Sequence, residues 1–558
     1  MATSTERGLG AARLALAALA VLPFAPSLAH PFFADDFIHL ERARALGGPP
    51  WPGLAEAWVL RAADSAAWWS PPDLAIAYFR PLVALSFVAD QALWGLAPWG
   101  FHLTNLLLHA ATTLVVYAIA LRLLGSGAAA FSAAALFAMH PCHAEAVLWV
   151  SGRTDLLAGL GSAAAFLLYM HSLQDEARAR ALLLASGLAL ALAVAAKEVA
   201  VCVPLLMLLY AVVAPGIAPR WRRAQGPLLA AVVVGAYVRM RSAVLGGSAL
   251  PPHPFAHGPG DPDFLAHGLM APFLYLADLV LFVPPDPVVT LPWWRAHPLA
   301  FAALAVLSTL TLLSSLRRVR EGWMRSFALG WVAVALLPAA LASVGERFLY
   351  LPSIGYCLLI GAGAGVLLQR DPPRARRLML ATGAVVAAVA VARTVAFGVL
   401  AGRSQQVVDD AVAALRAAPD RSLVLVVDLP AGAALGFAHA LRLERTAPLQ
   451  VEVLSLTPGF LPHDGTPASD VRLTPDGLVL SRPVPYLLNY VERAYLGDRA
   501  PLVSGDVVFR SGLSVLVREA AAGGVGSFEV RLRPEALPRS LLLRGHGLRL
   551  QADPAWLP

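Results

Sequence analysis

The first 400 residues alternate between long apolar stretches and short polar connections. A helix needs about 20 apolar residues to cross a bilayer. Segments near this length predict about eleven spanning helices, at 11–30, 102–123, 127–141, 154–171, 181–196, 199–214, 227–244, 298–315, 326–343, 351–369 and 378–399. Another apolar segment, 268–283, is followed directly by prolines, so we interpret it as re-entrant or interfacial.

The pattern changes after residue 403. A short helix over 405–417 is expected first, and apolar and polar residues then alternate with a period of two, which is typical of β-strands. The alternation predicts strands at 422–427, 450–456, 471–481, 506–510, 527–532 and 540–550. We therefore expect a polytopic α-helical membrane domain over 1–403 and a β-rich domain over 404–558.

The composition agrees with a membrane protein. Of the 558 residues, 58% are hydrophobic and 14% are charged, whereas soluble domains are about 25% charged. The three cysteines, Cys142, Cys202 and Cys357, lie in or beside apolar segments, so we expect small buried hydrophobic side chains rather than disulfides.

Arginine clusters between the apolar stretches predict the orientation. Cytoplasmic loops of membrane proteins carry an excess of Lys and Arg. With eleven spans, the clusters at 178–180, 220–223, 317–325 and 370–377 all fall on the side of the N-terminus. We expect an integral protein of a bacterial inner membrane, with a cytoplasmic N-terminus and an extracytoplasmic β-rich domain. The arginine-rich cytoplasmic loops then explain the net charge of +7, and no nucleic-acid partner is expected.

The segment 31–100 is long for a loop and is predicted to lie on the outer side. We expect one or two amphipathic helices there. Its tryptophans are of the type that sits at headgroup level; they are Trp51, Trp58, Trp68, Trp69, Trp94 and Trp99.

Two adjacent carboxylates, Asp35 and Asp36, follow the first apolar segment. Charges near a bilayer are functional candidates, and neighbouring carboxylates repel, which raises one pKa toward the range useful for proton transfer. We therefore predict Asp35 as a general base, with Asp36 as its hydrogen-bond partner or as a ligand of the acceptor. Acidic pairs also cap helices, which is the structural alternative.

Further charged and polar groups are predicted on the same outer side. They are His140, His143, Glu145, Arg153, Asp155, Lys197, Glu198, Arg241, Glu346, Arg347 and Tyr350. Cations beside carboxylates at headgroup depth suit a lipid-linked phosphate, since guanidinium and ammonium groups bind phosphate. A carboxylate would deprotonate the incoming hydroxyl.

Two structural alternatives stay open. Lys197, the only lysine among 43 basic residues, could pair with Glu198, and Arg347 could pair with Glu346. His140, His143 and Glu145 could bind zinc, but the helical spacing His-Glu-x-x-His is absent, so we favour substrate contacts. No cofactor is predicted to be required, and a divalent metal is left open.

Several segments together resemble the transmembrane and tetratricopeptide-repeat O-mannosyltransferases and their bacterial relatives. These segments are 78–82, 98–109, 140–147, 152–157, 197–198 and 346–353, and the resemblance covers roughly residues 30–400. The best-known members carry tetratricopeptide repeats at the end of the chain, whereas here a β-rich region follows residue 404.

The resemblance implies a C-type, inverting membrane glycosyltransferase. It would take a sugar, with mannose as one candidate, from a polyprenyl-phosphate carrier and transfer it to an acceptor hydroxyl on the extracytoplasmic side. The acceptor would be a protein, a glycan or a lipid. An acidic residue of the first outer loop, Asp35 or Asp36, would act as base. Carrier phosphate or sugar would be bound by Arg80, His102, Arg153, Lys197 and Arg347.

The alternative function is a transporter or flippase of lipid-linked sugars. Transporters of this kind often consist of two related halves with broken helices near the bilayer midplane. The sequence has no such internal repeat, and its charges gather on one side, which favours the transferase hypothesis.

Overall fold

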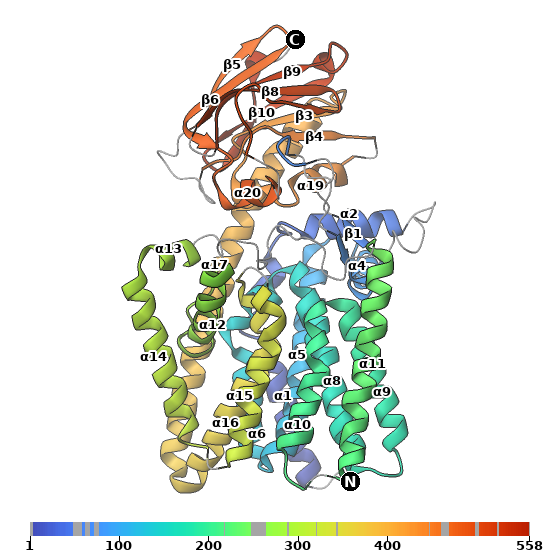
Figure 1. The fold of residues 1–558 in the computed structure, drawn as a ribbon, viewed down its shortest axis with the longest axis vertical. Helices are drawn as coiled ribbons and strands as arrows, with labels where there is room; N and C mark the ends of the chain where they lie inside the picture. The colour runs from blue at the N-terminus through green and yellow to red at the C-terminus, as the bar shows by residue number, and fades with distance from the viewer. Residues whose placement is uncertain are drawn as a thin grey trace. The chain divides into compact units, whose positions relative to one another are not determined.

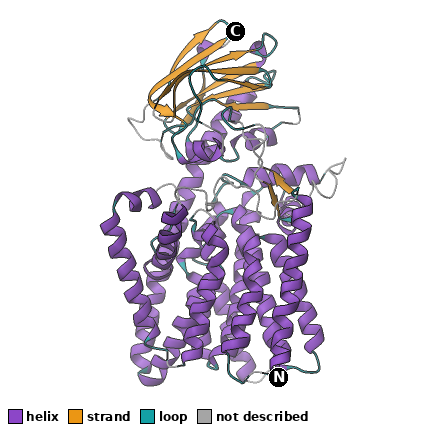
Figure 2. Ribbon diagram, viewed as in Figure 1, coloured by secondary structure: helices purple, strands orange, loops and turns teal. Residues whose placement is uncertain are grey.

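The computed structural model describes residues 4–47, 59–61, 67–71, 77–216, 218–246, 264–286, 290–319, 321–341, 344–445, 447–458, 468–496, 501–521 and 524–556. The chain forms two compact units. The first comprises Met1–His30, Phe79–Leu250 and Ala256–Gly398, and the second comprises Pro31–Tyr78, Pro251–Phe255 and Val399–Pro558. The first unit is a helix bundle, and most strands belong to the second (Figure 2). Segment 31–78, which the sequence analysis assigned to 1–403, thus groups with residues 399–558.

The helices of the bundle follow the predicted apolar segments closely, and each predicted span overlaps one of them. In chain order they are α1 (Ser4–Val21), α4 (Pro81–Trp94), α5 (Pro98–Leu124), α6 (Gly127–Met139), α8 (Arg153–Gln174), α9 (Ala179–Ala196), α10 (Val203–Val213), α11 (Arg220–Val244), α12 (Phe264–Leu281), α13 (Thr290–Ala296), α14 (Pro298–Leu316), α15 (Gly322–Leu336), α16 (Pro352–Arg370) and α17 (Pro372–Ala417). Within the described residues, eight helices are long and apolar enough to cross a membrane. The predicted fold class, a polytopic α-helical membrane protein with a β-rich C-terminal region, is confirmed.

Local sequence explains several helix ends. Pro98 and Pro352 stand at the first positions of α5 and α16, where proline loses no intrahelical hydrogen bond. Gly125 ends α5 with φ +60°, and Ser126 then caps α6 by accepting a hydrogen bond from Ala129 N. The result is a tight hairpin of α5 and α6.

Small residues allow neighbouring helices to approach closely. A Cβ added to Gly361 of α16 would lie 2.6 Å from the Cβ of Ala133 in α6. A Cβ on Gly161 of α8 would lie 2.8 Å from the Cβ of Ala193 in α9. Such small-residue contacts are typical of helix packing in membranes, where the hydrophobic effect contributes little to association.

The arginine-rich turns lie at one end of the bundle. Figure 1 shows that the turns from α8 to α9, α10 to α11, α14 to α15 and α16 to α17 share the end at which α1 begins. This is the sorting that the arginine clusters predicted.

At the other end, short helical turns interrupt the bundle. They are η2 (Pro141–His143), α7 (Ala144–Leu148), η3 (Val150–Gly152), η4 (Glu198–Cys202), η5 (Leu337–Leu341) and η6 (Glu346–Leu349). Segment 268–283 forms α12, one of the shorter apolar helices; whether it is re-entrant stays a prediction.

The second unit contains two larger sheets. In the first, β3 (Leu423–Val427) pairs in parallel with β4 (Gln450–Val453) and β10 (Ser540–His546), and β11 (Arg549–Ala552) pairs antiparallel with β10. Leu425 lies opposite Glu452 on one side and Leu542 on the other. Every residue of β3 is buried, as expected for a central parallel strand.

The second sheet is antiparallel, with the order β5-β6-β9-β8-β7. Its strands are β5 (Asp470–Thr474), β6 (Gly477–Tyr486), β7 (Val507–Arg510), β8 (Leu513–Ala521) and β9 (Gly524–Leu532). The predicted single strands at 471–481 and 540–550 were wrong in one respect, because each is a hairpin of two strands. The turn after β10 contains Gly547 at φ +61°. Strand β8 was not predicted.

Helices complete the second unit. They are α2 (Asp36–Leu46), α18 (Ala431–Ala434), α19 (Phe437–Leu443) and α20 (Tyr490–Leu496). A further small sheet pairs β1 (Val59–Arg61) with β2 (Ala77–Phe79). The short helix predicted over 405–417 is the end of α17.

The expectation for the tryptophans of 31–100 was partly wrong. Trp68 and Trp69 are fully buried in the second unit, because both indole N–H groups find backbone acceptors there. Trp99 is 47% exposed and lies against Trp94, as expected for residues at an interface. Trp51 and Trp58 lie outside the described residues. The three cysteines are free and buried, as predicted.

Candidate active site

Most of the predicted site residues lie on or beside the short helical turns that interrupt the bundle. Gly152, the last residue of η3, passes so close to Ala146 that a Cβ would lie 2.5 Å from its carbonyl oxygen. Only glycine fits there. The close approach sets the point at which α8 begins, and with it the positions of Arg153 and Asp155.

Lys197 forms an ion pair with Asp155 across two helices. Its Nζ lies 2.7 Å from Oδ1 and 2.6 Å from Oδ2, and both side chains are nearly buried. Nζ also lies 4.7 Å from the ring centroid of Phe348. The alternative in which Lys197 pairs with its neighbour Glu198 is therefore wrong. The backbone of Lys197 is extended after the end of α9, so the side chains of Lys197 and Glu198 leave the chain in different directions.

Glu198 instead pairs with two arginines. Its Oε2 accepts a hydrogen bond from Arg80 Nη2 at 3.0 Å, and its Oε1 lies 3.6 Å from Nε of Arg241. The side chain of Glu198 is 31% exposed, although its Oε1 is buried, and the side chains of Arg80 and Arg241 are 15% and 8% exposed. Glu198 thus joins Arg80, the residue before α4, to Arg241 of α11.

Arg347 pairs with Glu145, a residue some two hundred positions away in the chain. The backbone N–H of Arg347 donates to Glu145 Oε2 at 2.9 Å, and its guanidinium forms an ion pair with Oε1. Its guanidinium carbon also lies 5.3 Å from the ring centroid of Trp149. The alternative in which Arg347 pairs with Glu346 is wrong, because η6 turns their side chains to different partners.

Glu346 belongs to a second chain of contacts. It forms an ion pair with Arg393 of α17, which also donates to Asp278 Oδ1 at 2.7 Å and to Pro141 O at 2.9 Å. Glu346 Oε2 accepts from Glu145 N at 3.3 Å. Sequence reasoning missed Asp278 and Arg393. The available signal was that each of these residues is a single charge inside an apolar segment, because a charge there requires a partner.

Arg153 is fully buried and makes contacts only inside the bundle among the residues described. Its Nη2 lies 2.6 Å from Asp90 Oδ2 and 2.9 Å from Phe101 O, and Nε donates to Asn105 Oδ1 at 3.0 Å. The ring of Phe87 lies 4.8 Å from the guanidinium carbon. This environment is that of an architectural cation, and Asp90 is another partner that the sequence analysis missed.

His140 and His143 are also fully buried. His140 Nε2 donates to Leu279 O at 3.1 Å, and its Nδ1 accepts from Cys142 N at 3.2 Å. His143 Nε2 lies 2.9 Å from Ser353 Oγ. Both imidazoles thus take part in hydrogen bonds between elements of the bundle, and their role as substrate contacts stays a prediction.

Tyr350 and His102 lie in the interior as well. The Tyr350 hydroxyl donates to Nδ1 of His109 at 2.9 Å, while His109 Nε2 donates to Ala138 O at 2.9 Å. The rings of His102 and His30 meet edge to face at 5.9 Å. The sequence analysis did not name His109 as a candidate.

Asp35 and Asp36 belong to the second unit. Asp36 is buried at the start of α2, and its Oδ2 accepts a hydrogen bond from Phe33 N at 2.9 Å, which closes the turn before the helix. A carboxylate in the first turn is also favoured by the helix dipole. Asp35 is only partly buried. Burial, together with the negative charge of Asp35, raises the pKa of the Tyr495 phenol.

Metal binding was left open. Among the residues that the structure describes, His, Cys, Asp and Glu form no group of three or more that could hold a metal ion.

Residues 81–240 match the family model described as dolichyl-phosphate-mannose-protein mannosyltransferase. This part of the chain resembles that family. The match runs from the start of α4 into α11, so it includes Asp90, Arg153, Asp155, Lys197 and Glu198. The resemblance predicted from the motifs is confirmed over these residues.

Curated relatives match the chain in part. Protein O-mannosyl-transferase Tmtc2 of Drosophila melanogaster is 38% identical over 160 residues, which cover 28% of this chain and 16% of the relative. Human protein O-mannosyl-transferase TMTC2 is 45% identical over 92 residues, covering 16% and 11%. Drosophila Tmtc3 is 26% identical over 378 residues, covering 52% and 40%. The chain therefore spans less than half the length of each of these relatives.

Solved structures resemble the chain distantly. ArnT from Cupriavidus metallidurans bound to undecaprenyl phosphate is 18% identical, with a TM-score of 0.46 over 80% of this chain and 86% of that one. The archaeal oligosaccharyltransferase AglB from Archaeoglobus fulgidus, in complex with an inhibitory peptide and a dolichol-phosphate, is 13% identical, with a TM-score of 0.44 over 77% and 63%. Scores below 0.5 do not establish a common fold.

Proposed function

We propose that this protein is a membrane glycosyltransferase that takes a sugar from a polyprenyl-phosphate carrier and transfers it to an acceptor hydroxyl. The match of residues 81–240 to the mannosyltransferase family carries the proposal. It is supported by the ion pairs that the same stretch contributes at one end of the bundle. Mannose is the first sugar to test, because the relatives are named as mannosyltransferases.

The carrier phosphate is bound by cations that are not fully enclosed. The side chain of Arg80, which pairs with Glu198, is 15% exposed, and the side chain of Arg347 is 31% exposed. A guanidinium can exchange a carboxylate for a phosphate with similar geometry. Arg153 and Lys197 are nearly buried against carboxylates, so in this proposal they hold the helices that carry the site.

Asp35 acts as the general base. It accepts the proton of the acceptor hydroxyl while the hydroxyl oxygen bonds to the anomeric carbon of the sugar. The bond from that carbon to the phosphate oxygen breaks, and its electron pair stays on the phosphate. Attack from the face opposite the leaving group inverts the anomeric carbon. The arginines stabilise the charge that develops on the carrier phosphate. Asp36 supports Asp35 by holding the turn at the start of α2.

Purified protein and a panel of polyprenyl-phosphate sugars test the proposal. Mass spectrometry should detect release of the carrier phosphate together with the glycosylated acceptor. Asp35→Asn should lower the transfer rate on the order of 10²–10⁴-fold, the usual contribution of general base catalysis. Asp470→Asn, an exposed Asp of β5 in the same unit, is the matched control and should keep full activity. Full activity of Asp35→Asn would remove Asp35 from the mechanism.

The same protein in vesicles tests the alternative function. A flippase moves the lipid-linked sugar across the bilayer and leaves the bond between sugar and phosphate intact. Movement of an intact donor, without carrier release for any sugar and acceptor of the panel, would replace the transferase proposal with the transporter hypothesis.

We also propose the orientation. The end of the bundle with the arginine-rich turns is cytoplasmic, and the end with the ion pairs is extracytoplasmic, in agreement with the positive-inside rule. Single cysteines introduced at Asp175 and Asp420 should react with a membrane-impermeant maleimide from opposite sides. The native cysteines are buried and should stay silent. Labelling of both positions from one side would contradict this topology.

A further inference from the structure

The segment that carries Asp35 is packed against the C-terminal part of the second unit. Helix α2 begins directly after Asp35 and packs against α19. Glu41 of α2 forms an ion pair with His439 and lies 3.9 Å from Nη1 of Arg442. Arg44 Nη1 donates to Leu443 O at 2.7 Å. Contacts at two positions about one turn apart thus join a helix near the start of the chain to one about 400 residues later.

The closest approach is at the residue before Asp35. Gly436, which precedes α19, has φ +77°, and a Cβ built on it would lie 2.0 Å from the carbonyl oxygen of Ala34. Ala34 itself has φ +52°, an uncommon conformation for a residue other than glycine. The backbone that presents Asp35 is therefore shaped by direct contact with the backbone before α19.

The other end of the same segment is held by the parallel sheet. Trp68 Nε1 donates to Leu454 O at 2.9 Å, just after β4, and Ala67 forms an isolated parallel bridge with Val453. Trp69 Nε1 donates to Glu492 O at 3.1 Å. The carboxyl ends of parallel strands are where α/β sheets usually bind ligands. Here that edge binds a segment of the same chain.

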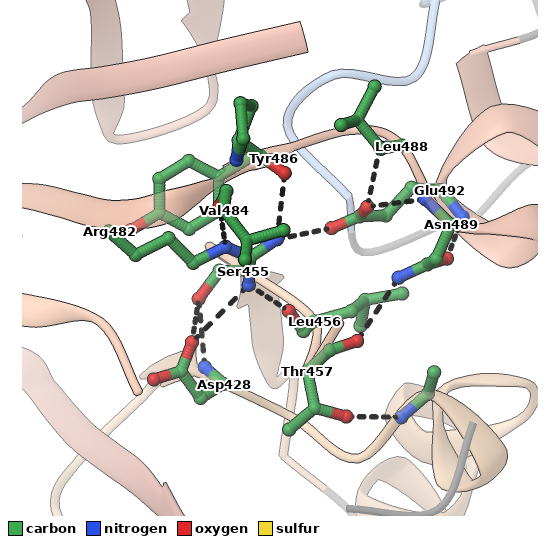
Figure 3. A network of polar contacts seen from close by, with 12 residues as sticks. Asp428, Ser455, Leu456, Thr457, Arg482, Val484, Tyr486, Leu488, Asn489 and Glu492 are labelled. Carbon is green, nitrogen blue, oxygen red and sulfur yellow. Dashed lines mark hydrogen bonds and ion pairs between the residues drawn. The ribbon is translucent and has the colours of Figure 1, made fainter. Parts of the chain in front are cut away.

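A buried polar network supports this edge. Figure 3 shows Arg482 between Asp428, which follows β3, and Glu492 of α20, at 3.9 Å and 3.6 Å. Arg482 Nη1 also donates to Leu456 O at 2.5 Å, and Asp428 Oδ1 accepts from Ser455 Oγ at 3.0 Å. Because these groups satisfy one another inside the unit, they hold the ends of β3 and β4 and the helix α20, whose Glu492 accepts from Trp69.

We propose that the C-terminal part of the second unit is a positioning element for the catalytic base, and that Gly436 and Glu41 are positioning residues that set the place of Asp35 through Ala34 and α2. The inference rests on the proposed function of Asp35. It assigns to residues 399–558 a part in the chemical step, where the sequence analysis left their role open.

Gly436→Ala tests the proposal in the full-length protein. The added Cβ displaces Ala34, and a displacement of about 1 Å at a reacting group can lower the rate on the order of 10²-fold. We expect kcat to fall by about that factor while KM for the donor changes less than about twofold. Gly547→Ala is the matched control, since Gly547 also has positive φ, but a Cβ there would meet nothing within 4 Å.

Glu41→Gln is a second, milder variant in case Gly436→Ala folds poorly. It removes the ion pairs with His439 and Arg442, and we expect kcat to fall roughly tenfold. Glu444→Gln, which breaks an ion pair with Arg416 in the same unit, is its control. Glu41→Asp should recover part of the lost rate.

Hydrogen exchange of residues 31–47 provides a readout that needs no activity. Exchange should be faster in Gly436→Ala and Glu41→Gln than in their controls. If the wild-type chain transfers no sugar, the proposed function fails, whereas faster exchange would still show that α19 holds α2. Equal exchange and equal kcat in each variant and its control would overturn the inference, as would a fall in kcat without faster exchange.

Discussion

Arg153 and Arg80 both lie in the helix bundle, yet their surroundings differ. Arg153 is fully buried, and its donors go to Asp90, Asn105 and backbone carbonyls. Arg80 shares the partly exposed Glu198 with Arg241. In the sequence, each is a single arginine in a motif that resembles the same family.

The difference separates architecture from ligand binding. A buried cation whose partners are complete gains nothing from a phosphate, because exchange would leave Asp90 charged and unpaired in the interior. Arg80 pairs with Glu198, whose side chain is partly exposed, so exchange of this carboxylate for a phosphate leaves no fully buried charge behind. The exposure of the ion pair, rather than the residue type, distinguishes the two roles.

Removal of the buried cation should have the largest effect. Arg153→Met leaves Asp90 without its ion pair, which should cost about 3–5 kcal/mol and lower Tm sharply. Arg153→Met combined with Asp90→Leu should recover most of the loss. Arg122→Met, at an exposed position of α5, is the control. Tm is measured by thermal denaturation in detergent. If Arg153→Met keeps the Tm of the wild type but no longer binds the donor, Arg153 binds the ligand.

Glu452 extends the comparison to a buried carboxylate held by a neutral amide, Gln450 Nε2 at 3.1 Å. Burial raises the pKa of Glu452 to about 7 from 4.5. The folded state therefore holds this proton more tightly than the unfolded state. The resulting stability is complete below about pH 4.5 and is lost as the pH rises through 7.

Glu452→Gln should accordingly stabilise the protein at pH 8, by on the order of 2–3 kcal/mol, and flatten the pH dependence of Tm between pH 5 and 8. Glu519→Gln, in β8 of the neighbouring sheet, is the control and should leave the pH dependence as it is. A lower Tm of Glu452→Gln at pH 8 would show that the carboxylate is stabilising in its ionised form.

Lys197→Arg tests whether Lys197 has a structural role like that of Arg153. The bulkier guanidinium must fit between Asp155 and the ring of Phe348, so we expect a loss of about 2 kcal/mol from overpacking with little change in KM. Tm and donor KM measured on the same preparation decide the matter. A raised KM at unchanged Tm would instead assign Lys197 to phosphate binding.

Arg80→Gln should have the smallest effect on stability and the clearest effect on binding. Loss of one charge-assisted contact should raise KM for the donor about tenfold, since such a bond contributes about 1.5–3 kcal/mol. Arg222→Gln breaks a comparable ion pair with Glu176 between the α8–α9 turn and α11, and it should leave KM unchanged. Equal KM values for the two variants would contradict a role of Arg80 in donor binding.

Part of the site could be predicted from the sequence. The apolar segments located the helices because about 20 consecutive apolar residues have few other stable environments. The arginine clusters predicted that the arginine-rich turns share one end of the bundle and that the other charged turns lie at the opposite end. The motifs around Arg153, Lys197 and Arg347 led to residues that do form ion pairs.

The partners could not be predicted in the same way. Neighbours in sequence suggested pairs of Lys197 with Glu198 and of Arg347 with Glu346, but a short helical turn directs adjacent side chains apart. Asp278 and Arg393 stand alone in apolar segments 115 residues apart, and their ion pair becomes visible only in the fold. Trp68 and Trp69 were expected at a membrane surface and are buried instead.

The sequence by itself determined the helical class, the change to strands after residue 403 and the residue types available for chemistry, because these follow from local composition and periodicity. Tertiary structure alone decided which cation meets which carboxylate, how far each pair is enclosed and which part of the chain holds the segment of Asp35. These properties depend on contacts between residues that are distant in the chain, and such contacts leave no periodic pattern in the sequence.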